Sequence, residues 1–156
     1  ATLIAYETEI LDTDDLFGYT KEMPLTINTS LAGSYEQKIN DEGSLIWESN
    51  GISVTSQVIE DARFVHHVQL FIRNDTDRNI NLTADDISVN GFTLSGLLIE
   101  NVAANSVAFG DLLVGESELE ENNITEIEEV TFTIRVNPAD DIFTTLAESP
   151  ELTVTP

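Results

Sequence analysis

Residues 130–136 read VTFTIRV, in which apolar and polar side chains alternate without a break. Successive side chains of a β-strand point to opposite faces of its sheet, so this pattern predicts a strand with one apolar and one polar face. The apolar positions hold Val, Phe, Ile and Val, which are favoured in strands that pack against a core. The stretch therefore predicts a half-buried strand near the end of the chain.

The same period of two recurs through much of the rest of the sequence. The pair Asn90–Gly91 separates two strand-like runs, and both residues tolerate the positive φ angles of a two-residue hairpin turn. Strand-like runs recur about every 10 residues, a spacing typical of sandwiches and not of βαβ units. We therefore expect an all-β fold, an immunoglobulin-like antiparallel β-sandwich. The runs lie at residues 52–58, 64–72, 80–82, 87–89, 92–94 and 107–114.

One short helical turn is expected in SELEEN, residues 117–122. Ser117 is placed to cap its start, and Glu120, three residues later, is placed to reach back in a capping box. The rest of the chain shows no helical period, so at most this short turn should interrupt the strands.

Composition limits the protein class. The chain has 156 residues, 41% of them hydrophobic, which suits one ordinary domain, or one domain with an additional segment, and is enough for a proper core. It has no apolar run of about 18 residues that would span a bilayer, and its start, ATLIAYETEI, does not resemble a signal peptide. Cysteine is absent, which excludes disulfides, thiolate catalysis and cysteine-based zinc sites.

The charge is strongly acidic: 29 Asp and Glu stand against 6 Lys and Arg, a formal net charge of −23. Such a surface repels nucleic acid and anionic lipid, so we expect no nucleic-acid partner and no direct membrane insertion of this region. It attracts cations and basic partners. Three interpretations stay open: a solvated surface that keeps a secreted protein soluble, calcium coordination, and adaptation to high salt.

A pattern in the first part of the chain is repeated near its end. Residues 4–28 align with residues 130–155 at an offset of 126, so that Asp14–Asp15 meets Asp140–Asp141, and one inserted residue then brings residues 25–27 onto residues 152–154. Both segments read as a strand, an acidic corner and a second strand. We therefore divide the chain into 1–28, a two-strand segment that is the tail of a preceding repeat or adds strands, and 29–156, the sandwich domain. The duplication predicts adjacent repeat domains, a tandem array, in the parent chain.

Several motifs also carry a family resemblance. A strand ending in NDTD (residues 74–77), the VNG hairpin (89–91) and the segments 117–136 and 140–155 resemble uncharacterised immunoglobulin-like repeats of bacterial secreted proteins and lipoproteins. The resemblance covers about the last 110 residues. Many members carry a GKK turn where this chain has Ala-Asn-Ser at 104–106. The resemblance implies a fold and an extracytoplasmic location, secreted or anchored in the cell envelope, but no activity.

Acidic loops are the candidate metal ligands, and calcium is the one cofactor they suggest. Calcium takes six to eight oxygen ligands, which Asp-rich loops can supply. No segment matches the D-x-[DN]-x-[DN]-G calcium loop, however, and Asp also marks turns by bonding its own backbone. The candidates are Asp12, Asp14, Asp15, Asp75, Asp77, Asp140 and Asp141.

Other chemistry has little support in the sequence. His66 and His67 are neighbours on a predicted strand and point to opposite faces, so they are not expected to chelate one metal. No G-x-S-x-G nucleophile motif occurs. Trp47 is expected in the core, which leaves Phe17, Tyr19 and Tyr35 as scattered aromatic groups for glycan binding.

The sequence thus favours a non-enzymatic structural or protein-interaction module of a cell-envelope or secreted protein. Its partner, a protein or a glycan, is not identified by any motif. The alternatives are a glycan- or calcium-binding sandwich domain and a hydrolase that uses two carboxylates.

Overall fold

The computed structural model describes residues 3–7, 21–25, 38–62 and 65–156. The chain separates into two compact units, Ala1–Ile39 and Asn40–Pro156, and each is described by itself. The domain boundary expected at residues 28 and 29 lies outside the described residues. In the first unit, β1 (Leu3–Glu7) and β2 (Lys21–Leu25) form an antiparallel pair.

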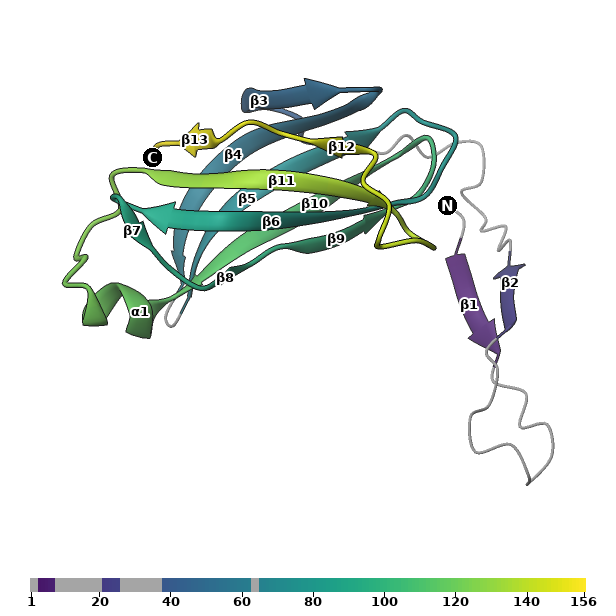
Figure 1. The fold of residues 1–156 in the computed structure, drawn as a ribbon. Coiled ribbons are helices and arrows are strands. Elements are labelled where there is room, and N and C mark those ends of the chain that lie inside the picture. The colour runs from purple at the N-terminus through teal and green to yellow at the C-terminus, as the bar shows by residue number, and fades with distance from the viewer. Residues whose placement is uncertain (1–2, 8–20, 26–37, 63–64) are drawn as a thin grey trace. The chain divides into compact units, whose positions relative to one another are not determined.

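The second unit contains two antiparallel sheets packed face to face (Figure 1). One sheet has five strands in the order β3-β4-β5-β10-β8: β3 (Ser44–Ser49), β4 (Ile52–Ala62), β5 (Val65–Asn74), β10 (Ser106–Gly115) and β8 (Gly96–Leu97). In the other sheet β11 pairs with β6, β12 and β13, and β6 also pairs with β7 and β9. Its members are β6 (Ile80–Val89), β7 (Phe92–Thr93), β9 (Ile99–Val102), β11 (Val130–Pro138), β12 (Ala147–Glu148) and β13 (Leu152–Val154). The predicted antiparallel β-sandwich is confirmed.

The core lies between the two sheets and is built by the alternation that the sequence shows. All four apolar side chains of VTFTIRV are buried in β11, whereas Arg135 on its opposite face is exposed. Each such burial contributes about 1.5–3 kcal/mol of transfer free energy. Trp47 is 8% exposed and belongs to this core, as expected. The five-stranded sheet contributes Ile52, Val54, Val68, Leu70, Ile72, Leu112 and Val114 from the other side.

β6 departs from the sequence prediction in one respect. Residues 80–82 and 87–89 were expected as separate strands, but they form one strand with a bulge between them. Asp86 adopts a φ of 53° there, and the register with β11 shifts between Thr131 and Thr133. An Asp tolerates this left-handed conformation, which lets the strand absorb an extra residue without ending. The expected hairpin turn follows, with φ of 49° at Asn90 and 81° at Gly91.

The short helix occurs as α1 (Glu116–Glu121), but the predicted capping box is wrong. The helix start lies two residues earlier than expected, with Gly115 in place of Ser117 at the N-cap, because β10 runs directly into the helix through Gly115, whose backbone is extended. Ser117 therefore lies inside the first turn, and no side chain caps the helix start. No helix among the described residues is long and apolar enough to cross a bilayer.

Candidate functional site

The predicted metal ligands do not gather into a metal site in the part of the chain that the structure describes. Two acidic turns, one after β5 and one after β11, lie at the same end of the sandwich, where the Ala139 amide donates to the Asn79 carbonyl (3.0 Å). Even so, no group of three or more His, Asp or Glu among the described residues is placed to hold a metal ion. These turns carry Asp75, Asp77, Asp140 and Asp141, whereas Asp12, Asp14 and Asp15 lie outside the described residues.

Asp141 shows what an acidic residue does in such a turn. Its carboxylate accepts hydrogen bonds from the Thr144 hydroxyl (2.6 Å) and the Phe143 amide (3.1 Å). The Thr144 hydroxyl, and then the backbone amides of Phe143 and Thr144, lower the pKa of Asp141 below its usual value. The side chain therefore closes its own turn, which is the backbone-bonding role that Asp often takes in loops.

The buried amide of Asn74 organises the turn after β5, and its long-range contacts could not be predicted from the sequence. Its Nδ2 donates to the carbonyls of Arg78 (2.8 Å), Ala103 (3.0 Å) and Val102 (3.2 Å). Its Oδ1 accepts from the amide (3.1 Å) and the hydroxyl (2.7 Å) of Thr76. Asn-x-Thr at a strand end is a recognised turn signal, but the contacts across the sandwich leave no local trace in the sequence.

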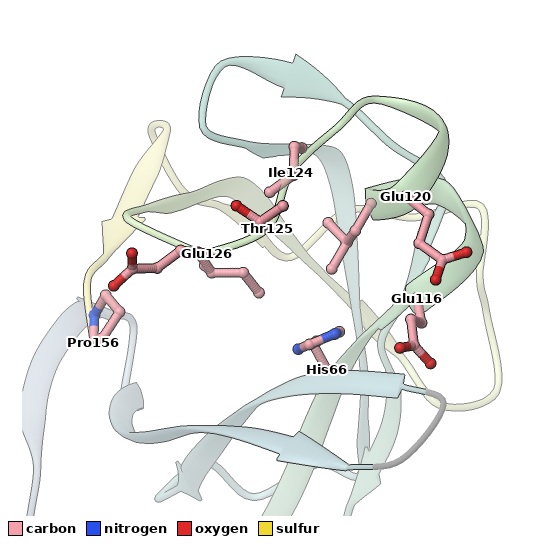
Figure 2. Close-up of a pocket in the computed structure, with 9 residues that line it drawn as sticks. His66, Glu116, Glu120, Ile124, Thr125, Glu126 and Pro156 are labelled. Carbon is pink, nitrogen blue, oxygen red and sulfur yellow. The ribbon is translucent and has the colours of Figure 1, made fainter.

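An open cavity of about 510 Å³ lies beside α1. Figure 2 shows His66 at its base, Glu116 and Glu120 on the α1 side, and Glu126 across from them. His67, the next residue of β5, does not line this cavity. The full lining is His66, Glu116, Leu119, Glu120, Ile124, Thr125, Glu126, Ile127 and Pro156.

The cavity has an apolar floor beneath its acidic rim. Leu119 is buried, and Ile124 and Ile127 are half-buried, whereas Glu120 and Glu126 are exposed. A second gap, between the sheets, shares His66 and Ile127 with the cavity and has no room for a water molecule. Its other lining residues are His67, Val68, Leu112, Val114 and Val130.

Hydrogen bonds hold the wall of the cavity in place. After α1 the chain turns back, and the Ile124 amide donates to the Leu119 carbonyl (2.8 Å). Farther along, Asn90 Nδ2 donates to the Glu126 carbonyl (2.8 Å), and Asn90 Oδ1 accepts from the Glu128 amide (2.8 Å). The segment from α1 to β11 is therefore tied to the core at one end and to the β6–β7 hairpin at the other.

The outer face of the five-stranded sheet carries large apolar side chains. Phe109 (47% exposed) and Leu113 (37%) lie on β10, and Leu97 (54%) on β8 stands opposite Leu113. Leu45 (61%), on the edge strand β3, extends this surface on the other side. Phe71, in the middle of the same face, is only 4% exposed. The Phe109 ring packs beside it at a centroid distance of 5.4 Å, and the Arg73 guanidinium lies 5.7 Å from the Phe71 ring centroid.

Charged groups lie among these apolar side chains. Asp111 is exposed and lies between Phe109 and Leu113 on β10. Burial, and then the charge of Asp111, raise the pKa of Glu100, which lies on β9. Arg73 follows on the same face, with its guanidinium 4.0 Å from the carboxylate of Asp41.

Comparisons with known proteins leave the function open. No family model matches the chain, and no curated protein matches it. A crystal structure described as a protein from Archaeoglobus fulgidus matches with a TM-score of 0.35 and 15% sequence identity, covering 69% of this chain and 96% of that chain. Nothing about function is carried over from so distant a likeness.

Proposed function

We propose that this domain is a non-enzymatic protein-interaction module of a cell-envelope or secreted protein, and that it docks its partner through the outer face of the five-stranded sheet. The apolar docking face, defined as the exposed side chains Leu45, Leu97, Phe109 and Leu113, is the observation that carries this proposal. The extracytoplasmic location is supported by the resemblance to immunoglobulin-like repeats, and adjacent repeat domains stay a prediction from the duplicated pattern.

The docking face departs from what a solvated sheet surface normally presents. One face of an antiparallel sheet packs on the core, and the other is usually polar because it meets water. Here Leu97 on β8 and Leu113 on β10 are directly opposed cross-strand neighbours. Phe109 also lies on β10, four residues before Leu113. Clustered apolar side chains at such a position mark protein-interaction surfaces more often than scattered ones do.

Charge identifies the chemistry of the partner. Asp111 sits inside the apolar docking face, and Glu100 on β9 adds a second acidic group, whose pKa is raised first by burial and then by the Asp111 charge. The whole chain has a charge of −23, so a second copy would meet strong repulsion. A surface that presents an apolar centre with lysine or arginine beside it complements both features.

The test is an NMR titration of the ¹⁵N-labelled full chain with a short capped peptide of alternating leucine and lysine. We expect saturable shifts at the amides of β5, β8 and β10. Phe109→Ser should weaken this binding about tenfold, because a buried phenylalanine side chain contributes about 1.5–3 kcal/mol. The matched control is Ile142→Ser, which removes an apolar group that is 65% exposed in the turn after β11.

Two further peptides separate charge from apolar contact. A lysine–serine peptide tests attraction to the acidic chain alone, and a glutamate–leucine peptide tests apolar contact alone. The proposal requires both to bind more weakly than the leucine–lysine peptide. It is overturned if either binds equally well, if the shifts fall outside the docking face, or if Ile142→Ser weakens binding as much as Phe109→Ser.

A further inference from the structure

We infer that the cavity beside α1 binds an organic cation, an ammonium or guanidinium group carried on an apolar stem. This inference rests on the cavity alone and not on the docking face, which is built from other residues. Its ligand chemistry follows from the size of the cavity, its apolar floor, its acidic rim and the bonds that fix its wall.

The cavity is large enough for an organic molecule. Its 510 Å³ lies within the range of about 300–1,000 Å³ that small-ligand sites occupy. The same space would hold roughly 17 water molecules at about 30 Å³ each. A single hydrated ion would leave most of it filled with water against Leu119, Ile124 and Ile127. An apolar stem would instead cover that floor and release this water.

The rim determines the sign of the ligand charge. Three carboxylates line the cavity, and its lining contains no lysine or arginine. Glu116 and Glu120 lie on α1, and Glu126 lies on the loop on the other side of the opening, so that acidic residues flank the cavity on two sides (Figure 2). An anion would be repelled from this position. The three carboxylates instead give the cavity a negative potential, which attracts a cation.

The spacing of the carboxylates argues for an extended cation and against a bare metal ion. Among the described residues no three acidic or histidine side chains converge closely enough to share a metal. An ammonium or guanidinium group needs no such convergence, because it forms separate hydrogen bonds in several directions. A stem attached to it can lie on the apolar floor at the same time.

The wall of the cavity is held before any ligand arrives. Asn90 ties the loop to the β6–β7 hairpin through the Glu126 carbonyl and the Glu128 amide, and the Ile124 amide bonds to the Leu119 carbonyl. A preformed wall reduces the ordering cost of binding. The cavity therefore needs no large rearrangement to accept its ligand.

The experiment is an NMR titration of the ¹⁵N-labelled full chain with hexylammonium chloride, at constant ionic strength. We expect saturable shifts at the amides of His66, Leu119 and Ile124–Ile127. Glu120→Gln should weaken binding about fivefold, in line with the loss of one close charge pair near a protein surface. Glu121→Gln is the matched control, because Glu121 is exposed on the same helix and does not line the cavity. It should change binding less than about twofold.

Two uncharged or larger probes complete the test. Hexan-1-ol has the same stem without the charge and should bind at least about fivefold more weakly. Nα-acetyl-lysine N-methylamide distinguishes the two sources of this chemistry: matching shifts would assign the site to a protein lysine, and binding of hexylammonium alone would assign it to a free amine. The inference is overturned if neither cation gives saturable shifts at the cavity, if hexan-1-ol binds as tightly, or if Glu121→Gln weakens binding as much as Glu120→Gln. Shifts confined to β10 would contradict this inference while leaving the docking proposal standing.

Discussion

Replacing Asn74 by alanine tests how the turn after β5 is held to the rest of the sandwich. The side chain is fully buried, donates to three carbonyls and accepts twice from Thr76. A hydrogen bond contributes about 1 kcal/mol net, and a buried polar group left without a partner costs about 1–3 kcal/mol. We therefore expect Asn74→Ala to lower the free energy of unfolding by about 3–4 kcal/mol, a large part of the 5–15 kcal/mol typical of a domain.

The assay is urea unfolding followed by the fluorescence of Trp47, which is the only tryptophan and is buried in the core. Measurements at about 0.5 M NaCl keep charge repulsion from dominating the result. Asn101→Ala is the matched control, because Asn101 is exposed and accepts one hydrogen bond from Asn81 (3.2 Å). It should change stability by less than about 0.5 kcal/mol. A loss below about 1 kcal/mol in Asn74→Ala, or an equal loss in the control, would refute this stabilising role of the Asn74 hydrogen bonds.

Two further predictions concern charge. Burial and the Asp111 charge raise the pKa of Glu100 above its ordinary 4.5, so the folded chain holds this proton to higher pH than the unfolded chain does. Ionised Glu100 therefore destabilises the fold above its folded-state pKa. We expect Glu100→Gln to raise the urea midpoint of unfolding at pH 7 and to leave it unchanged below pH 4.5. An equal effect at both pH values would contradict this account. In thermal melts NaCl should raise Tm, because salt screens a charge of −23, and calcium at matched ionic strength should add nothing if the acidic loops only bond their own turns. A further rise with calcium, abolished by EDTA, would contradict the turn role, since a site at 100 times its Kd adds about 2.7 kcal/mol.

The fold was predictable where the evidence was local. Alternation in VTFTIRV states directly which side chains of β11 are buried, because the strand period of two needs no knowledge of the partner strand. The Asn90–Gly91 turn was predictable for a similar reason, since positive φ depends on the residue itself. The hydrogen bonds of Asn74 were not predictable from the sequence, because two of its acceptors, the carbonyls of Val102 and Ala103, are 28 and 29 residues away.

The candidate binding surfaces were less accessible from sequence because each joins distant segments. The cavity brings His66 on β5 together with the loop around Ile127, and no local pattern links them. The docking face leaves a partial trace in the sequence. Leu70, Phe71 and Ile72 are consecutive apolar residues, and such a run indicates a strand that is covered on both faces.

Salt acts in opposite directions on the fold and on the proposed docking. Screening reduces the self-repulsion of a chain with charge −23, so salt should favour the compact state. The same screening weakens the attraction between Asp111 and a basic partner. Apolar contact at Phe109 and Leu113 is not screened, so its share of the binding should persist as salt rises. In the proposed docking, the acidic charge of the chain thus limits self-association and speeds the approach of a basic partner. The binding affinity that remains at high salt then measures the contribution of the apolar face.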